Sequence, residues 1–182
     1  MENLEIRTAR LHIRNLKEKD LNDFYVYRSN PEIVKYQDFD IMSFEKAKTF
    51  IVAQKDRSFG VPGQWVQYGI EKKTSGKIIG DCAVRLEESD TRIAEIGITI
   101  SHLHQKNGYA KEAMLGLIDF LFAVKKIHRI VETVDVENGA SIRLIESLGF
   151  RKEGHFIENL FFNEKWGSEF QYAMLQREWR SK

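Results

Sequence analysis

The residues with the clearest chemical potential form the stretch Gln105-Lys106-Asn107-Gly108-Tyr109-Ala110, which directly precedes a segment of helical periodicity. The first N–H groups of a helix have no intrahelical partners and lie at the positive end of the helix dipole. Gly108 lets the backbone approach a ligand closely, while Lys106 and Lys111 add positive charge. These features predict a pyrophosphate site, although they also suit an ordinary loop that turns at a glycine before a core helix.

A second candidate is Glu95, in the middle of a predicted strand over residues 92–100. The strand alternates, with Ile96, Ile98 and Ile100 on one face and Glu95, Gly97 and Thr99 on the other. A carboxylate in a central strand is costly to bury unless it has a partner or a task. Glu95 is therefore either a group with a chemical role or a solvated or salt-bridged residue at a sheet edge.

A third candidate is Asn138-Gly139-Ala140-Ser141, which follows a predicted strand over residues 129–136. Strand 92–100, a helix over 109–124 and strand 129–136 form a βαβ unit, which requires a parallel strand pair. The carboxyl ends of parallel strands open onto one crevice, so Ile100, residues 105–110 and residues 138–141 should converge. We expect Asn138 to cap the following helix, from where its amide can also face a ligand.

Apolar and turn-forming residues predict the elements around this unit. The helix over 109–124 has an apolar stripe made of Ala110, Ala113, Met114, Leu117, Ile118 and Leu121. We also expect a strand within 4–15, a helix from an Asp20 cap to Asn30-Pro31, a helix capped by Ser43, a loop at 60–63, strands at 65–71 and 77–86 with a turn at 73–76, a helix from Asn138 to Gly149, and strands near 156–162 and 170–175 with residues 165–167 between them. This order predicts an α/β (α+β) fold with a central mixed, mostly antiparallel sheet.

Composition narrows the class of protein. The 182 residues are 42% hydrophobic and 30% charged, with no repeat or linker, so we expect one domain over residues 1–182. A net charge of +1 gives no bulk electrostatic reason to bind nucleic acid or an anionic membrane. The single cysteine excludes an intrachain disulfide, and the scattered histidines predict no metal site. The acidic N-terminal residues and the lack of a long apolar segment predict a cytoplasmic protein.

Four ordered blocks resemble the GCN5-related N-acetyltransferase (GNAT) superfamily, and within it the ribosomal-protein N-acetyltransferase branch (RimJ/RimL type). They are Thr8–Arg14 (T-x-R-L-x-L-R in the branch, with Ile13 at its second leucine), Ala94–Gly97 (A-E-I-G), Gln105–Ala110 ([QR]-x-x-G-x-[GA]) and Asn138–Phe150 (N-x-x-S-x-x-L-x-x-x-L-G-F). The segment from Gly154 to Trp179 is also similar to the branch, so the resemblance covers essentially the whole chain. It implies a GNAT-type fold in which the parallel strands splay apart, flanked by helices.

The resemblance also implies acetyl-CoA as the acyl donor and a primary amine as the acceptor. It assigns the acetyl and pantetheine end of the donor to the backbone of Ile98, Thr99 and Ile100, with a further contact from Asn138. The pyrophosphate falls on the loop and first helical turn, at Gln105, Lys106, Asn107, Gly108, Tyr109, Ala110 and Lys111. Glu95 would be the general base that deprotonates the amine, directly or through a water.

One position departs from the wider superfamily. Many members have a tyrosine on the short helix that protonates the departing thiolate, and the matching residue here is Ile145. Ser141 is the nearest candidate for that role. The expected function is N-acetyl transfer, with a non-catalytic acyl-CoA-binding sensor or scaffold of the same fold as the alternative. The missing tyrosine favours the alternative slightly, whereas Glu95 and the loop favour the enzyme.

The acceptor, a small molecule or a peptide, is not specified by the sequence, and we expect a monomer or a homodimer. Acceptor pockets in this superfamily are built by the first two helices and the loop between the last strands. Those segments here carry aromatic and acidic residues, which suit a cationic substrate but also suit a core or a solvated surface: Tyr25, Tyr27, Tyr36, Trp65, Trp166, Asp38, Asp40 and Glu158.

Overall fold

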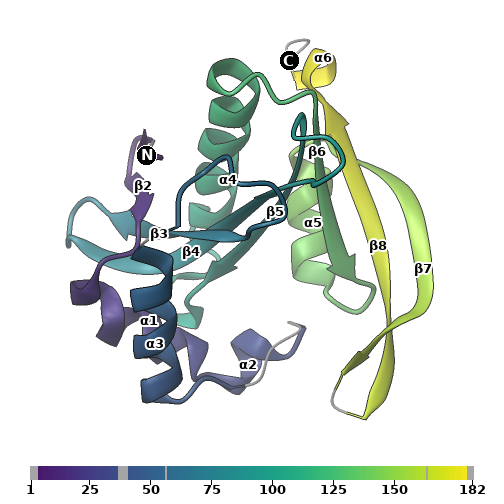
Figure 1. Cartoon of the computed structure of the whole chain (residues 1–182). Helices are drawn as coiled ribbons and strands as arrows, with labels where there is room; N and C mark the ends of the chain where they lie inside the picture. Colours follow the sequence, from purple (N-terminus) through teal and green to yellow (C-terminus); the bar gives the residue numbers. More distant parts are fainter. Residues whose placement is uncertain (1–3, 37–40, 56, 163, 180–182) are drawn as a thin grey trace.

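The computed structural model describes residues 4–36, 41–55, 57–162 and 164–179. Within these ranges, eight strands form one sheet in the order β1-β2-β3-β4-β5-β6-β8-β7 (Figure 1). The strands are β1 (Ile6–Arg7), β2 (Leu11–Asn15), β3 (Val66–Lys72), β4 (Lys77–Leu86), β5 (Ile93–Ile100), β6 (Arg129–Asp135), β7 (Arg151–Phe162) and β8 (Lys165–Leu175). The mixed α/β architecture predicted from the sequence is confirmed.

The pair β5–β6 is parallel, and the other neighbouring strands are antiparallel. The β5–β6 register consists of three residue pairs and ends where Glu95 faces Val131. Both strands continue beyond that point, β5 to Ile100 and β6 to Asp135, while each keeps its antiparallel partner on the other side. The parallel strands therefore separate at Glu95, which is the expected splay.

Helices cover both faces of the sheet. They are α1 (Leu21–Arg28), α2 (Pro31–Val34), α3 (Phe44–Lys55), α4 (Tyr109–Asp119), α5 (Gly139–Ser147) and α6 (Gln176–Trp179), with a π-helical segment, Phe120–Val124, continuing α4. Residues of α4 and α5 share one hydrophobic cluster, and residues of α1 and α3 share another. The adjacent residues Ile79 and Ile78 of β4 belong to the first and second cluster respectively, so the two clusters lie on opposite faces.

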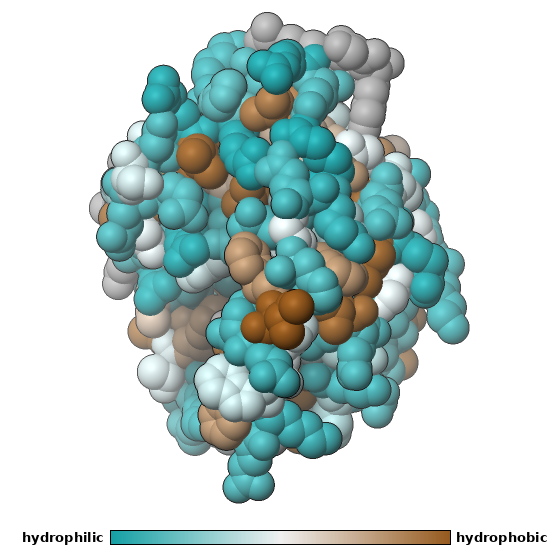
Figure 2. All heavy atoms as spheres, turned by 90° about the vertical axis from the view of Figure 1, so that its right-hand side faces the viewer, coloured by the Kyte–Doolittle hydropathy of each residue, from teal (hydrophilic) through white to brown (hydrophobic). Residues whose placement is uncertain are grey.

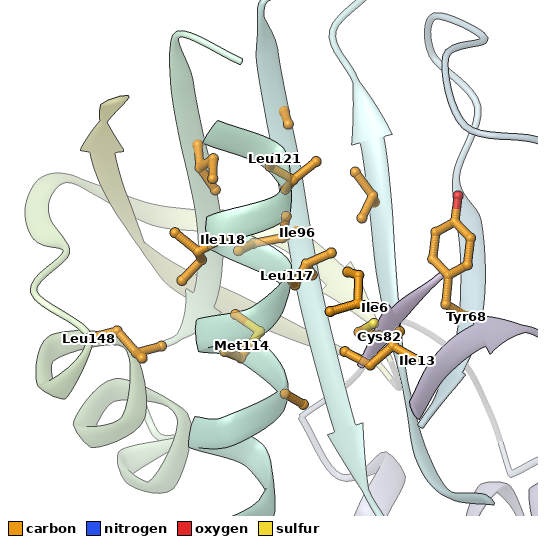
Figure 3. Packing of buried hydrophobic residues seen from close by; sticks show 14 of the residues in the cluster. Ile6, Ile13, Tyr68, Cys82, Ile96, Met114, Leu117, Ile118, Leu121 and Leu148 are labelled. Atoms are coloured by element: carbon orange, nitrogen blue, oxygen red, sulfur yellow. The ribbon is translucent and has the colours of Figure 1, made fainter. Parts of the chain in front are cut away.

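The larger cluster packs α4 against the sheet. Four labelled side chains of the predicted stripe and its π-helical continuation, Met114, Leu117, Ile118 and Leu121, point from the helix toward the strands that carry Ile96 and Ile6 (Figure 3). All four are buried. A Cβ at Gly116 would lie 2.9 Å from the Thr8 methyl group, so this glycine lets α4 approach the N-terminal segment closely. The middle of α4 thus packs closely against the N-terminal segment and the sheet.

Several sequence predictions need correction. The strand expected within 4–15 is two short strands, β1 and β2, paired with each other. Asp20 precedes α1 without capping it, because its carboxylate accepts hydrogen bonds from Arg14 instead. Lys165–Gly167, expected between strands, begins β8. Ser43 does accept a hydrogen bond at the start of α3, as predicted.

Among the described residues, no helix combines the length and apolar character that crossing a membrane requires.

Candidate active site

The loop before α4 has the backbone geometry of an anion site. Lys106 and Gly108 both have left-handed backbone angles, with φ of +61° and +75°. Two side chains hold the loop from within: Gln105 donates to the carbonyl of Ile100 at 3.1 Å, and Asn107 donates to the carbonyl of Gln105 at 2.8 Å. No side chain of the described chain caps the start of α4. The N–H groups of the first turn, which includes Ala110 and Lys111, are thus left for a ligand.

Arg10 fixes this loop from the neighbouring N-terminal segment. Its Nη1 donates to the carbonyl of Asn107 at 3.0 Å, and its Nε donates to the carboxylate of Glu112. Its guanidinium lies 4.4 Å above the ring of Tyr109. Thr8 donates to the same Glu112 carboxylate at 2.6 Å. Sequence analysis singled out Thr8–Arg14 only as a family block, because contacts between residues so far apart in sequence leave no local pattern.

The Glu112 carboxylate in the first turn of α4 is neutralised by this arrangement. Burial opposes ionisation, but hydrogen bonds from Thr8 and Arg10 lower the pKa of Glu112 below its usual value. Glu112 therefore carries a charge that Arg10 balances. The positive end of the α4 dipole remains suited to an anion.

Glu95 has the partner that its position demands. Arg85 faces it across the β4–β5 register and donates a hydrogen bond to its carboxylate. Burial raises the pKa of Glu95, and Arg85 partly counteracts that effect. The Arg85 guanidinium also lies 5.2 Å from the centre of the Trp65 ring and 3.6 Å from Glu87. The carboxylate is both salt-bridged and located where the parallel strands part, so the two explanations offered by the sequence are compatible.

A second carboxyl group, Glu132, lies in β6 and was missed by sequence analysis. It is 4% exposed, and its Oε2 atom has no hydrogen-bond partner among the described residues. Burial and the nearby charge of Glu95 raise its pKa to about 8. The sequence did contain a signal for this residue, because Glu132 lies between the apolar residues Val131 and Val134 of a predicted strand. As for Glu95, a carboxyl group in a central strand is costly to bury unless it has a partner or a task.

The start of α5 has the predicted cap. The Asn138 side chain accepts a hydrogen bond from the backbone N–H of Ser141 at 3.1 Å. Ser141 is half-buried in the first turn, and Ile145 one turn later is 1% exposed within the main hydrophobic cluster. Because β5 and β6 are parallel, Asn138 follows the same edge of the sheet at which Ile100 and the 105–108 loop lie. The three predicted segments share one edge.

Comparison with known proteins agrees with this geometry. The family described as "Acetyltransferase (GNAT) domain" matches residues 10–151. The N-acetyltransferase p20 of Bacillus licheniformis, named as uncharacterized, is 30% identical over 173 residues, which span 94% of this chain and 96% of that protein. The crystal structure of a GNAT-family acetyltransferase from Bacillus anthracis superposes with a TM-score of 0.86 at 26% identity, covering 96% of this chain and all of the other. The chain belongs to the GNAT acetyltransferase family.

The GNAT fold is also shared with a spermidine N-acetyltransferase from Vibrio cholerae, solved in complex with CoA and spermine. That structure superposes with a TM-score of 0.80 at 24% identity, and the match covers 94% of this chain and 99% of the other. At this identity the likeness establishes the fold. Family membership and fold together fix the general arrangement of strands and helices around the splay.

The candidate acceptor residues of this GNAT chain separate into distinct groups. Tyr27 is a core residue whose hydroxyl donates to Asp81 at 2.6 Å, and burial raises its pKa. Tyr25 packs edge-on against Phe44. Trp65 is the aromatic candidate linked to Glu95, through Arg85. Asp38 and Asp40 lie outside the described residues.

Two of the three remaining candidates, Trp166 and Glu158, lie on the long β7–β8 hairpin. Trp166 is 60% exposed and packs against Phe161, whose ring centre is 5.1 Å away. Phe156 and Ile157 are also exposed, and this side of the molecule shows apolar side chains among polar ones (Figure 2). Glu158 is exposed on the same hairpin. Tyr36, near α2, lies against Lys35, whose Nζ is 5.0 Å from the ring centre.

Proposed function

We propose that this protein is an acetyl-CoA-dependent N-acetyltransferase that moves the acetyl group to a primary amine by direct attack, with residues 1–182 as one catalytic domain. The observation that supports this most is the position of Glu95 at the point where the parallel strands part, at the same sheet edge as the uncapped start of α4. Family membership and the CoA complex of a protein with the same fold support the donor.

The donor fits the residues present. Its pyrophosphate would accept hydrogen bonds from the backbone N–H groups between Lys106 and Lys111, because the left-handed angles in the loop and the absence of a cap expose them. Its pantetheine arm would bond to the open edge of β5 at Ile98, Thr99 and Ile100. Asn138, at the end of the neighbouring strand, is placed to contact the same arm.

The chemistry would begin with the acceptor. An amine with a pKa near 8–10 is mostly protonated at pH 7, so a base must remove a proton before attack. Glu95 would do this, with Arg85 holding its carboxylate in place. Backbone N–H groups on the open edge of β5 would stabilise the oxyanion that forms on the thioester carbonyl. For the proton that the departing sulfur takes up, the family resemblance offers Ser141, or a water next to it, as one candidate donor.

The acceptor side faces α1 and α3. Arg85 links Glu95 there to Glu87 and to the Trp65 ring, and an aromatic ring with carboxylates suits an ammonium group. Both a small polyamine, the substrate class named for the Vibrio cholerae relative, and a protein N-terminus, as in the RimJ/RimL branch, present such a group.

A panel of amine acceptors assayed with acetyl-CoA tests the proposal. Thiol release would be measured with spermidine, spermine, an aminoglycoside and peptides with a free N-terminus. Release that depends on one class of amine supports the proposed function and names the acceptor class. Tight CoA binding without amine-dependent release would contradict it and favour the non-catalytic acyl-CoA sensor or scaffold.

A further inference from the structure

Two carboxyl groups flank the opening between β5 and β6 from opposite faces of the sheet. Ala94 and Ile130 face each other in the register and both belong to the cluster under α4 and α5. Side chains alternate along a strand, so Glu132 shares the face of Ile130, while Glu95 lies on the face toward α1 and α3. The opening therefore has a carboxylate on the proposed acceptor side and a carboxyl group on the side of α5.

Within the part of the chain that the structure describes, the Oε2 atom of Glu132 has no hydrogen-bond partner that would explain its burial. Tyr172 faces it from β8, but the Tyr172 hydroxyl donates to Glu146 of α5 at 2.9 Å. The residues that α4 buries in the cluster are apolar. Among the described residues, the titratable groups around Glu132 are Glu95 from β5, Tyr172 from β8 and, beyond Tyr172, Glu146 from α5 and Lys152 from β7, whose Nζ is 5.8 Å from the Tyr172 ring centre. The Lys152 ammonium lies over the rings of Phe170 and Tyr172 and is not paired with Glu132, and burial together with Glu95 raises the pKa of Glu132 to about 8.

The proposed reaction requires a proton on this same face. The position that carries a tyrosine in many GNAT proteins is Ile145, which is packed in the core and has no proton to give. A carboxylic acid that keeps its proton near neutral pH, with one oxygen unpartnered at the opening, can supply that proton. We propose that Glu132 is the catalytic residue that protonates the departing thiolate. This inference rests on the proposed function.

The step balances when the two carboxyl groups are considered together. The proton that Glu95 first takes from the ammonium group passes to solvent. The neutral amine nitrogen then forms a bond to the thioester carbonyl carbon and loses a second proton to Glu95, and the C–S bond breaks as the sulfur takes the proton from Glu132. The products are the amide and the free thiol, with Glu95 protonated and Glu132 ionised. A proton passing from Glu95 to Glu132 restores the starting state, so the pair holds one proton from the neutral amine onward, and the net proton released is the one from the ammonium group.

Glu132→Gln tests the role, because glutamine keeps the shape and the neutral charge but cannot transfer a proton to sulfur. We expect kcat to fall by ~10–10²-fold, with CoA affinity from calorimetry unchanged within about threefold. In the unchanged protein kcat should decrease as the pH rises through about 8, and this decrease should vanish in Glu132→Gln. Glu132→Asp, which keeps an acidic proton, should recover part of the loss, and Glu146→Gln on α5 is the matched control.

A ligand-free measurement separates this inference from the proposed function. As the pH is raised from 5 to 8, the melting temperature of the unchanged protein should decrease relative to that of Glu132→Gln. This holds whatever reaction the protein catalyses. Amine-dependent turnover that is equal in Glu132→Gln and the unchanged protein at every pH would overturn the role of Glu132 alone. Absence of turnover with every amine in the unchanged protein would overturn the proposed function and, with it, this role.

Discussion

Arg10 and Asn107, 97 positions apart in the sequence, are joined by a hydrogen bond of 3.0 Å from the guanidinium to a backbone carbonyl. The bond ties the N-terminal segment to the loop that opens α4. Because the C=O and N–H of a trans peptide unit point in opposite directions, the Gly108 N–H points away from Arg10. The loop geometry thus depends on a side chain outside the βαβ unit.

Arg10→Lys should weaken CoA binding while the protein stays folded. Lysine keeps the charge but lacks the planar set of donors that bridges Asn107 and Glu112. We expect CoA affinity, measured by calorimetry, to fall by roughly five- to twentyfold, equivalent to about 1–2 kcal/mol. Arg7→Lys, on an exposed side chain of the same segment, is the control. Equal CoA affinity in both variants would show that the Arg10 contacts do not shape the donor site.

Gly108→Val should abolish the loop conformation. A β-branched residue is strained at the φ of +75° that Gly108 adopts, so the backbone must shift. We expect CoA affinity to fall at least tenfold, by an estimate from this strain of roughly 1–3 kcal/mol. Gly76→Val is a matched control, because Gly76 has φ of +66° in the β3–β4 turn with open space around it. Loss of CoA binding in both variants would point to general unfolding instead.

Parts of this site follow from local sequence and parts do not. The cap at Asn138, the turn at Gly108 and the apolar stripe of α4 depend on nearby residues, and each was predicted correctly. The contacts of Arg10, the pairing of Arg85 with Glu95 and the proximity of Glu132 to Glu95 depend on strand order and register, which a single sequence does not specify.

Local prediction failed where a partner on a neighbouring strand competed. Asp20 has the residue type of a helix cap, yet Arg14 takes both of its carboxylate oxygens, at 2.7 and 2.9 Å. Two hydrogen bonds between opposite charges in a buried fork outweigh the single backbone N–H that a cap would engage, so the Arg14 pair prevails. Lys165–Gly167 resembled a turn, but pairing with Phe162, Phe161 and Leu160 of β7 extends the strand through it.

Ser141→Ala and Ile145→Tyr address the proton donor from the side of α5. The Ser141 contact to Asn138 uses the backbone N–H, so the alanine variant keeps the cap. We expect kcat to fall by about tenfold or less, below the usual range for loss of a general acid, because Glu132 supplies the proton. Steady-state kinetics check this, and a larger loss than in Glu132→Gln would reverse the ranking of the two residues.

Adding Ile145→Tyr should not raise the kcat of Ser141→Ala or of Glu132→Gln. Ile145 is buried in the main cluster, so a larger side chain with a hydroxyl should destabilise the protein by ~1–3 kcal/mol through overpacking and a lost hydrogen bond. A thermal melt of Ile145→Tyr, with Ile145→Leu as a volume-conserving control, measures the effect. Recovery of Ser141→Ala activity by the tyrosine would instead indicate that the helix can present a phenol to the sulfur.

The pH dependence of stability reports on Glu132 directly. Its pKa is about 8 in the folded protein and about 4.3 in an unfolded chain, so the folded state favours the proton. The contribution of Glu132 to stability is therefore complete below about pH 4 and is lost as the pH rises toward 8, by up to about 5 kcal/mol. The melting temperature of Glu132→Leu minus that of the unchanged protein should therefore be larger at pH 8 than at pH 4. A pH-independent difference between the leucine variant and the unchanged protein would show that Glu132 is ionised in the fold.

Turnover by Glu95→Gln tests the central claim most directly, since glutamine preserves the shape at the opening of the strands and removes the base. We expect kcat with the preferred amine to fall by ~10²–10⁴-fold at pH 7, while CoA affinity stays within about threefold. Raising the pH should recover part of the activity, because a larger fraction of the amine is then already deprotonated. Turnover within a few-fold of the unchanged protein at pH 7 would contradict the account and leave Glu95 as the structural partner of Arg85.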